Sequence, residues 1–419
     1  MAIDSTLPTG PLGQPDIAYA PDHAKYKART QHRLATEKLS TTLPPGFPSI
    51  LDSDLVWDNT DIASRYDWAY VLSPSDLEEI DKALKHFKTL GKPLGYIKQS
   101  TFPLNELHGK LRQISRDVHQ GFGFKVVRGV PVERYWREDV LAIYAGIAAH
   151  VADTRGRQDH QWEGKPADVV LNHIFDLSAK VDAKKIGAPA YTADKQVFHT
   201  DSGDVIALLC LEEAAQGGQS KLSSSWRVYN ELASTRPDLI RTLAEPWISE
   251  NFDGKGKGWS ERPLLFYQGK GEGKGEEEHM IIQYARRTFT GFQGLPRSAS
   301  IPPITEAQAE ALDALHFLAE RFALTLDFQK GDIQFANNLS IFHARDGFTN
   351  SEEKQRHLVR LWLRDEELKW DLPEQLKERF DKVYKDVKPE AQVFPLEPYV
   401  RSSAAGKGEK NDGSIVVRY

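Results

Sequence analysis

Apolar residues recur every three or four positions in several segments of the chain, which is the pattern of an amphipathic helix. The clearest segment begins at Ser73, a good N-cap, carries acidic residues in its first turn and ends at Gly91. The segment 305–324 is rich in alanine, leucine and glutamate, which have high helix propensity. The segments for which we expect helices are 73–91, 104–121, 139–152 and 305–324.

Between these segments the pattern changes to short runs of β-branched and aromatic residues, which favours strands. Such runs lie at 122–132, 167–177 and 205–212. In 326–368, Lys-Gly-Asp and Asn-Asn turns separate further short strands. Short strands joined by such turns are typical of an antiparallel barrel or jelly roll. We therefore expect a fold that is mainly β with flanking helices, built on a cupin-like jelly-roll core.

The ends of the chain and one internal segment have the composition of loops. Residues 1–50 are rich in Pro, Thr and Gly, which predicts an extended N-terminal arm. The segment 254–278 is rich in Gly and Lys, but it lacks the motifs of a phosphate-binding loop, so we expect mobile loops there. We expect a single domain over 51–395, followed by a loose C-terminal tail over 396–419.

Composition narrows the class of protein. An apolar fraction of 40% supplies a sizeable core, and a formal charge of −6 without a Lys/Arg block predicts no nucleic-acid partner. The single cysteine, Cys210, lies in an apolar run, which fits a reducing compartment. Because no signal-peptide pattern and no apolar run of membrane-spanning length are present, we expect a cytoplasmic protein without a membrane partner.

His199 and Asp201 stand two residues apart, directly before the apolar run at 205–212. In an extended strand, residues i and i+2 project from the same face, so both side chains could reach one metal ion. Because His and acidic residues are numerous, about two His-x-Asp pairs are expected by chance, and the pair alone is weak evidence. A metal site therefore needs a third ligand from another part of the chain.

The segments LSIFHAR and RHLVRLWLR contain further candidates. His343 shares a strand face with Ile341, and taken alone it is most simply interpreted as a hydrogen-bonded core histidine. Arg356 and Arg360 share one face of their strand, whereas the opposite face is almost purely apolar. If the apolar face packs under helices, both guanidinium groups point into the barrel, where each needs an anion. The alternative is that both arginines are solvated or paired with the acidic segment RDEEL.

Two histidines and one carboxylate on one face of a metal leave three coordination positions open. This arrangement is typical of non-haem Fe(II) enzymes that activate O₂. A 2-oxo acid can occupy two of these positions with its C1 carboxylate and ketone, while a distant arginine binds its other carboxylate. The residues therefore indicate Fe(II), a 2-oxo acid and O₂.

Four motifs occur in an order that resembles the TauD/TfdA (taurine dioxygenase-like) family of Fe(II)/2-oxoglutarate-dependent oxygenases, particularly its fungal members. The motifs are FHTDSGDVIALL, EEAAQGGQSKLSSSWRVYNELASTRPDL, KGDIQFANNLSIFHARDGF and RHLVRLWLR. The resemblance covers most of residues 120–370. It implies a double-stranded β-helix core with a large insertion over about 212–331.

The resemblance also implies roles for individual residues. His199, Asp201 and His343 match the iron ligands of the family. Arg356 matches the anchor for the C5 carboxylate of 2-oxoglutarate. Ser220 stands where the family often has a threonine that contacts the same cosubstrate.

Around the substrate, the resemblance is less complete. Arg360 matches the position that in several members grips an acidic group, which implies a small anionic substrate. Phe198 stands at an aromatic position of taurine dioxygenase, so we expect it to wall the pocket. Lys195 departs from the taurine dioxygenase pattern, and a taurine-specific pocket is not expected. His173 could line the pocket, but a structural histidine is the simpler interpretation.

We therefore expect an oxygenase that converts 2-oxoglutarate to succinate and CO₂ while it oxidises an unactivated C–H bond of a small carboxylate or amino-acid-like substrate. Hydroxylation is the default outcome, and desaturation or cyclisation would use the same ligands. Two alternatives stay open: a cupin-like metal enzyme that does not use 2-oxoglutarate, and a non-catalytic scaffold that binds a small acid. The motifs define neither the substrate nor the oligomeric state, so homo-oligomer formation is also open.

Overall fold

The computed structural model describes residues 10–252, 258–271, 277–405 and 415–416. All four predicted helices are present, as α3, α4, α5 and α9. Within the described ranges, no helix is both long enough and apolar enough to serve as a membrane span. The α-helices are α1 (His23–Thr36), α2 (Ile62–Arg65), α3 (Pro74–Thr89), α4 (Asn105–His119), α5 (Arg137–Val151), α6 (Ser225–Thr235), α7 (Pro237–Ala244), α8 (Arg287–Thr290), α9 (Glu306–Phe322) and α10 (Glu374–Tyr384).

Two sheets form the core of the molecule. The larger has the order β1 (Ala69–Val71), β2 (Phe124–Arg128), β18 (Ile333–Asn337), β8 (Val205–Glu212), β21 (His357–Arg364) and β3 (Thr154–Gly156), and β6 (Leu171–Phe175) also pairs with β21. The smaller has the order β17 (Leu324–Thr325), β10 (Ser220–Ser224), β19 (Ile341–Arg345) and β7 (Gln196–His199). The pairs within the core of both sheets are antiparallel, and together the sheets form the predicted double-stranded β-helix.

Short strands decorate this core, and some of them lie where we expected mobile loops. Strands β12 and β13 fall inside 254–278, although 253–257 and 272–276 lie outside the described residues. Each pairs with a strand that the Gly-rich composition does not reveal. The additional strands are β4 (Asp159–Trp162), β5 (Lys165–Val169) and β22 (Gln392–Val393) in one sheet, and the pairs β11 (Trp247–Glu250) with β12 (Trp259–Arg262), β13 (Leu265–Gln268) with β14 (His279–Ile282), β15 (Gly291–Phe292) with β16 (Leu295–Pro296), β9 (Gln216–Gly217) with β20 (Phe348–Thr349), and β23 (Tyr399–Val400) with β24 (Ile415–Val416).

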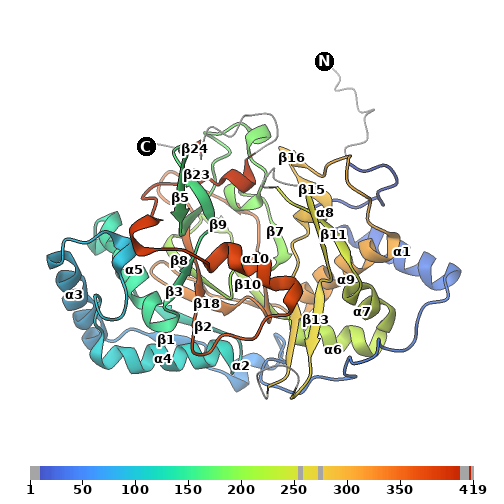
Figure 1. Cartoon of the computed structure of the whole chain (residues 1–419), viewed down its shortest axis with the longest axis horizontal. Helices are drawn as coiled ribbons and strands as arrows, with labels where there is room; N and C mark the ends of the chain where they lie inside the picture. The colour runs from blue at the N-terminus through green and yellow to red at the C-terminus, as the bar shows by residue number, and fades with distance from the viewer. Residues whose placement is uncertain (1–9, 253–257, 272–276, 406–414, 417–419) are drawn as a thin grey trace.

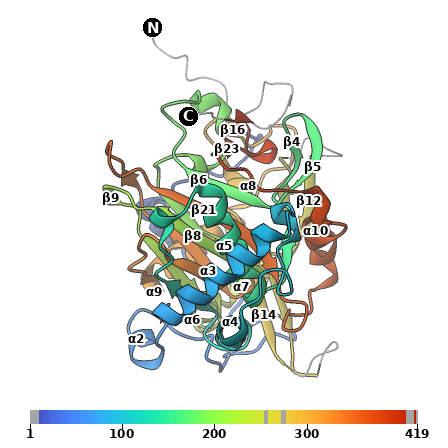
Figure 2. The ribbon, with the colours of Figure 1, turned by 90° about the vertical axis from the view of Figure 1, so that its left-hand side faces the viewer.

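Helices α3, α4 and α5 cover the outer face of the larger sheet (Figure 2). Alternate residues of β21, namely Val359, Leu361 and Leu363, join these helices in one buried apolar cluster. Because side chains alternate across a strand, the residues between them point into the space between the two sheets. This is the orientation that we predicted for Arg360.

Helix α9 covers the smaller sheet on the opposite side of the molecule, so the strands lie between two groups of helices (Figure 1). Its residues Ala311, Leu312 and Leu315 pack in the same apolar cluster as Phe342 of β19. A capping box at Thr305 fixes the start of this helix. The sheet that carries two candidate metal ligands is therefore held rigidly from behind.

The N-terminal segment is not the extended arm that we expected, because it contains the helix α1. Asp22 caps this helix by accepting hydrogen bonds from two backbone N–H groups. Arg33 of α1 forms an ion pair with the fully buried Glu310 of α9, and Arg236 pairs with the same carboxylate. The helix was missed because it docks mainly through charged side chains, which leave no apolar stripe in the sequence.

The C-terminal segment also differs from its expectation, since its described part is packed and not loose. Arg401, Ser402 and Ala404 are buried. Asp159 of β4 accepts hydrogen bonds from both the backbone N–H and the hydroxyl of Ser402, at 2.7 and 2.6 Å. Residues 406–414 and 417–419 lie outside the described part of the chain.

The substitution Glu310→Gln should lower the free energy of unfolding by about 3 kcal/mol, because it leaves buried guanidinium groups with one carboxylate fewer. Glu306→Gln is the matched control: it removes the same charge from the same helix, but its carboxylate is 58% exposed and should cost less than about 1 kcal/mol. Urea-induced unfolding of both variants measures the difference. Equal losses would contradict the role given to the buried pairs.

Candidate metal centre and cosubstrate pocket

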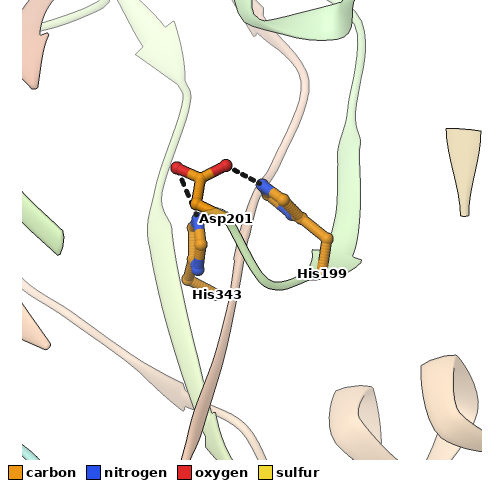
Figure 3. A group of neighbouring side chains, drawn as sticks. All are labelled: His199, Asp201 and His343. Atoms are coloured by element: carbon orange, nitrogen blue, oxygen red, sulfur yellow. Dashed lines mark ion pairs between the residues drawn. The ribbon is translucent and has the colours of Figure 1, made fainter. Parts of the chain in front are cut away.

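Three side chains that can bind a metal lie close together, as Figure 3 shows. His199 and His343 occupy directly opposite positions of the paired strands β7 and β19. One ligand atom from each of His199, His343 and Asp201 lies within 4.8 Å of the others. Among the described residues, this is the single cluster of three or more such groups. The structure thus brings together all three predicted ligands.

Asp201 reaches the cluster from a turn and not from a strand, as the i, i+2 argument assumed. Strand β7 ends at His199, and β8 starts only at Val205. The side chain of Asn338, from the Asn-Asn turn, accepts from the backbone N–H of Asp201 at 2.7 Å and donates to its carbonyl and to that of Gly203. These bonds fix the turn, and they depend on tertiary contact that no local pattern reveals.

The histidines are presented in the form that binds metals. The Nδ1 atom of His199 donates to the carbonyl of Val197 at 2.9 Å, so Nε2 carries the lone pair that a metal would bind. In this structure that lone pair accepts from the side-chain amide of Gln196 at 3.0 Å. Burial lowers the pKa of His199, and burial together with the neighbouring His199 lowers the pKa of His343 to about 3. Both imidazoles are therefore neutral at physiological pH.

The carboxylate of Asp201 is kept charged although it is buried. Burial raises its pKa, but the neighbouring groups Arg360, His343, His199 and Arg401, with Arg360 contributing most, together outweigh this effect and hold the pKa well below its usual range. The Oδ2 atom accepts from Arg360 Nη1 at 2.6 Å and from Trp362 Nε1 at 3.2 Å. Arg360 and Trp362 share the inner face of β21, so a single strand supplies both donors.

This donor set fits a divalent first-row metal. Two neutral imidazole nitrogens and one carboxylate suit Fe(II), and three protein ligands leave coordination positions open. The hydrogen bonds from Arg360 and Trp362 orient the carboxylate. The hydrogen bond to Val197 orients one of the imidazoles. Such outer contacts raise metal affinity and fix the geometry of a site.

A pocket extends from the two histidines into the barrel and carries the predicted cosubstrate residues. Its lining includes His199, His343, Ser220, Arg356 and Arg360. The pocket lies in the space between the two sheets, because its lining residues come from β6, β7, β8, β10, β19 and the start of β21. One cavity therefore connects the two histidines with three buried arginines, Arg345, Arg356 and Arg360.

Arg356 is a buried cation without a carboxylate partner among the described residues. Its Nε donates to the carbonyl of Gly218 at 3.2 Å, while its Nη1 is buried and makes no hydrogen bond. Burial, reinforced by the nearby charge of Arg345, lowers the pKa of Arg356 to about 9, so the group is still charged at neutral pH. A carboxylate in the pocket would satisfy this charge.

The Gly-Gly pair before Ser220 makes room for this arginine. Gly217 and Gly218 have φ angles of +74° and +73°, which favour glycine. A Cβ atom on Gly218 would lie 2.9 Å from the side chain of Arg356.

Ser220 donates to Gln334 Oε1 at 2.8 Å, and the buried Nε2 of Gln334 has no partner. Gln334 is therefore a further candidate contact that sequence reasoning missed.

Arg360 was predicted to bind an acidic group of the substrate, but in the structure it also binds protein side chains. Besides Asp201, it contacts Gln158, which accepts from Arg360 Nε at 2.8 Å. Its Nη2 atom is buried without a partner. The guanidinium group thus orients a metal-binding carboxylate, and one of its nitrogens stays available to a ligand.

Several other expectations need correction or are resolved by the contacts. Phe198 does not line the pocket, because it points to the opposite side of β7 from His199, where it lies 5.8 Å from the ring of His316. Lys195 pairs with Glu320. His173 is structural, since one of its ring nitrogens lies 2.7 Å from His357 and the other 2.8 Å from the carbonyl of Pro395.

Fold and site together define a non-haem metalloenzyme with a jelly-roll core. A model of the taurine catabolism dioxygenase TauD, TfdA family matches residues 88–362. Taurine hydroxylase-like protein SAT17 of Stachybotrys chartarum is 37% identical over 356 residues, which cover 83% of this chain and 89% of that relative. FR-33289 synthase of Streptomyces rubellomurinus is 24% identical over 315 residues, which cover 74% and 88%. The chain therefore belongs to the TauD, TfdA dioxygenase family.

Solved structures share the same fold. Asparagine oxygenase in complex with Fe(II), 2S,3S-3-hydroxyasparagine and succinate has a TM-score of 0.51 at 16% identity, over 71% of this chain and 93% of that chain. The non-haem iron oxygenase OrfP in complex with Fe and alpha-ketoglutaric acid has a TM-score of 0.50 at 16% identity, over 71% and 94%. Family and fold make this protein a non-haem dioxygenase that uses Fe(II), 2-oxoglutarate and O₂.

The substitution Asp201→Ala should weaken Fe(II) binding by more than about a hundredfold, because it removes the one anionic donor of the cluster. Asp346→Ala is the control: this aspartate lies close in sequence to His343, but it pairs with Lys221 on the outside of the site. An anaerobic titration with Fe(II), monitored by calorimetry, measures the Fe(II) affinity of both variants. A similar affinity in the two variants would remove Asp201 from the ligand set.

Proposed function

We propose that the protein hydroxylates an unactivated C–H bond of a small anionic substrate and forms succinate and CO₂ from 2-oxoglutarate. In this proposal Fe(II) is held by His199, Asp201 and His343. The iron supplies the activation of O₂ when it is bound together with 2-oxoglutarate. Arg356 and Ser220 hold the far carboxylate of this cosubstrate.

The observation that carries the proposal is the buried charge of Arg356. An unpaired guanidinium group inside a barrel is costly, and a carboxylate that binds it as a bidentate fork removes most of that cost. Arg356 lines the pocket and has a free Nη1 atom, while Gln334, whose Nε2 atom is free, accepts a hydrogen bond from the pocket residue Ser220. The two histidines line the same pocket. A dicarboxylic 2-oxo acid is therefore the ligand whose two ends match the two kinds of site.

The residues of the chain have distinct tasks in this proposal. Arg360 and Trp362 keep Asp201 ionised and oriented. The apolar side chains Leu358 and Ile174 line the same pocket and make its surroundings less polar. Less polar surroundings strengthen each charge-assisted hydrogen bond, so the cosubstrate is held in one orientation.

An anionic substrate is supported by Arg360, whose Nη2 atom is buried without a partner. The names of two relatives point to small charged compounds, since SAT17 is called taurine hydroxylase-like and a human relative, 23% identical over 198 residues, is called gamma-butyrobetaine dioxygenase. The first name also supports hydroxylation as the outcome. These names belong to the relatives, and for this chain they motivate the choice of compounds to test.

The direct test is to incubate the Fe(II)-loaded protein with 2-oxoglutarate, O₂ and a panel of small carboxylates, sulfonates, phosphonates and amino acids. The proposal predicts that one group of acids stimulates succinate formation and gains one oxygen atom, as mass spectrometry would record. Oxidation of a panel member without succinate would favour the cupin-like enzyme that does not use 2-oxoglutarate. If the iron-loaded protein converts neither 2-oxoglutarate nor any member of the panel, the result would favour a non-catalytic binding scaffold.

The substitution Arg356→Ala should weaken 2-oxoglutarate binding by about 3 kcal/mol, because it removes a buried, charge-assisted and bidentate contact. Binding of Mn(II), used as a redox-stable substitute for Fe(II), should stay unchanged. Arg356→Lys keeps the charge but not the bidentate geometry of the guanidinium group. Its affinity for 2-oxoglutarate should therefore fall between those of the wild-type protein and Arg356→Ala. Calorimetry of the Mn(II)-loaded variants measures these affinities, and equal losses of metal and 2-oxoglutarate binding would show that Arg356 acts on the fold instead.

A further inference from the structure

Guanidinium groups from three separate parts of the chain gather around Asp201 and Trp362. Arg360 comes from β21, Arg379 from α10 and Arg401 from the segment that follows β23. Arg379 donates to the hydroxyl of Ser202, the neighbour of Asp201, at 2.7 Å. We call these three residues the arginine group.

Arg401 approaches the metal centre through Trp362. The guanidinium carbons of Arg360 and Arg401 lie 5.0 and 5.6 Å from the centre of the Trp362 ring. Guanidinium groups are attracted to such rings, which position them without neutralising their charge. The indole N–H of the same ring donates to Asp201. Arg401 is therefore adjacent to the residues that orient the metal-binding carboxylate.

The positive charge of the arginine group exceeds the negative charge available to it. Among the described residues, Asp201 is the one carboxylate with which any of the three forms an ion pair, and it pairs with Arg360 alone. Each member has a buried nitrogen without a hydrogen bond: Nη2 of Arg360, Nε of Arg379 and Nε of Arg401. The charge of Asp201 is also required by the metal. The group therefore lacks at least two negative charges.

The segment that carries Arg401 is held firmly in place, so the excess charge is built into the fold. Asp159 binds the backbone and hydroxyl of Ser402. The hydroxyl of Tyr191 accepts from the backbone N–H of Arg401 at 3.3 Å, and Gly187 N–H donates to the carbonyl of Ala404 at 2.7 Å. Because the segment is already fixed, the protein loses less conformational entropy when Arg401 binds a ligand.

We propose that Arg401 is a second substrate anchor beside Arg360, and that the substrate carries two negative charges at the end that they bind. This inference rests on the proposed function and narrows its substrate class. A phosphonate or phosphate group and a pair of carboxylates share this chemistry, whereas a sulfonate or a single carboxylate supplies only one charge. Arg360 and Arg401 lie against the same indole ring, and two neighbouring guanidinium groups can both donate to such a doubly charged group.

The test compares ligands that differ in charge but hardly in shape. Ethylphosphonate is titrated against ethanesulfonate, and malonate against acetate, into Mn(II)- and 2-oxoglutarate-saturated protein under argon, at a pH where the phosphonate is doubly charged. Calorimetry should give at least about tenfold tighter binding for the doubly charged member of one pair. The pair that shows this preference distinguishes a phosphonate-type from a dicarboxylate substrate. No preference in either pair, including no binding by any of the four, would overturn the proposal.

Variants assign the preference to Arg401. Arg401→Gln should abolish the tenfold preference, and Arg401→Lys should restore part of it, because the charge returns without the planar fork. Arg321→Gln is the control, since its side chain is 62% exposed and it removes the same charge far from the arginine group. A preference that survives in Arg401→Gln would overturn the role of Arg401. If the wild-type protein does not bind 2-oxoglutarate at all, the proposed function fails before this inference is reached.

Discussion

The structure depends on keeping one carboxylate charged inside a barrel. Burying an isolated carboxylate costs several kcal/mol, and in most surroundings the group would take up a proton instead. Here Arg360 and Trp362 donate to Asp201, and two neutral imidazoles lie beside it. All of these groups come from strands of the barrel or from the turn between two of them, so the β-helix is what makes a buried anionic ligand stable.

The same constraint explains the distribution of arginines. Under the proposed function, a barrel interior that binds a metal, a dicarboxylic cosubstrate and an acidic substrate must hold positive charges that stay unpaired until the ligands arrive. Arg356 near the Gly-Gly turn and Arg401 near Trp362 are two such charges at different places. Each is positioned by backbone carbonyls or an aromatic ring and not by a carboxylate, so neither loses its capacity to bind an anion.

Much of this site can be predicted from sequence because β21 follows a strict period of two. The alternation of apolar and charged residues in RHLVRLWLR gives the correct inner face, and the order of the motifs gives the ligand candidates. Asn338, Gln158 and Gln334 could not be found in this way, because their roles arise from segments of the chain that meet only in the fold. Phe198 was misassigned because an aromatic residue beside a ligand faces the opposite side of the strand.

The two ends of the chain show a different limit. Helix α1 and the segment around Arg401 have loop-like or polar composition, yet both dock on the core. They do so through ion pairs and hydrogen bonds to buried partners such as Glu310 and Asp159, and such contacts leave no hydrophobic period to read. The docked C-terminal segment places Arg401 against Trp362, which donates to the metal-binding Asp201, so polar composition is a poor guide to which segments lie near the site.

The most direct test of the account is an anaerobic titration of the protein with Fe(II) and 2-oxoglutarate, followed by visible absorption spectroscopy. Chelation of the iron by the 2-oxo acid gives a weak charge-transfer band that neither component produces alone. The account predicts that this band appears in the wild-type protein only when both are present. Protein that demonstrably holds iron but shows no band on addition of 2-oxoglutarate would contradict the assignment of the pocket to this cosubstrate.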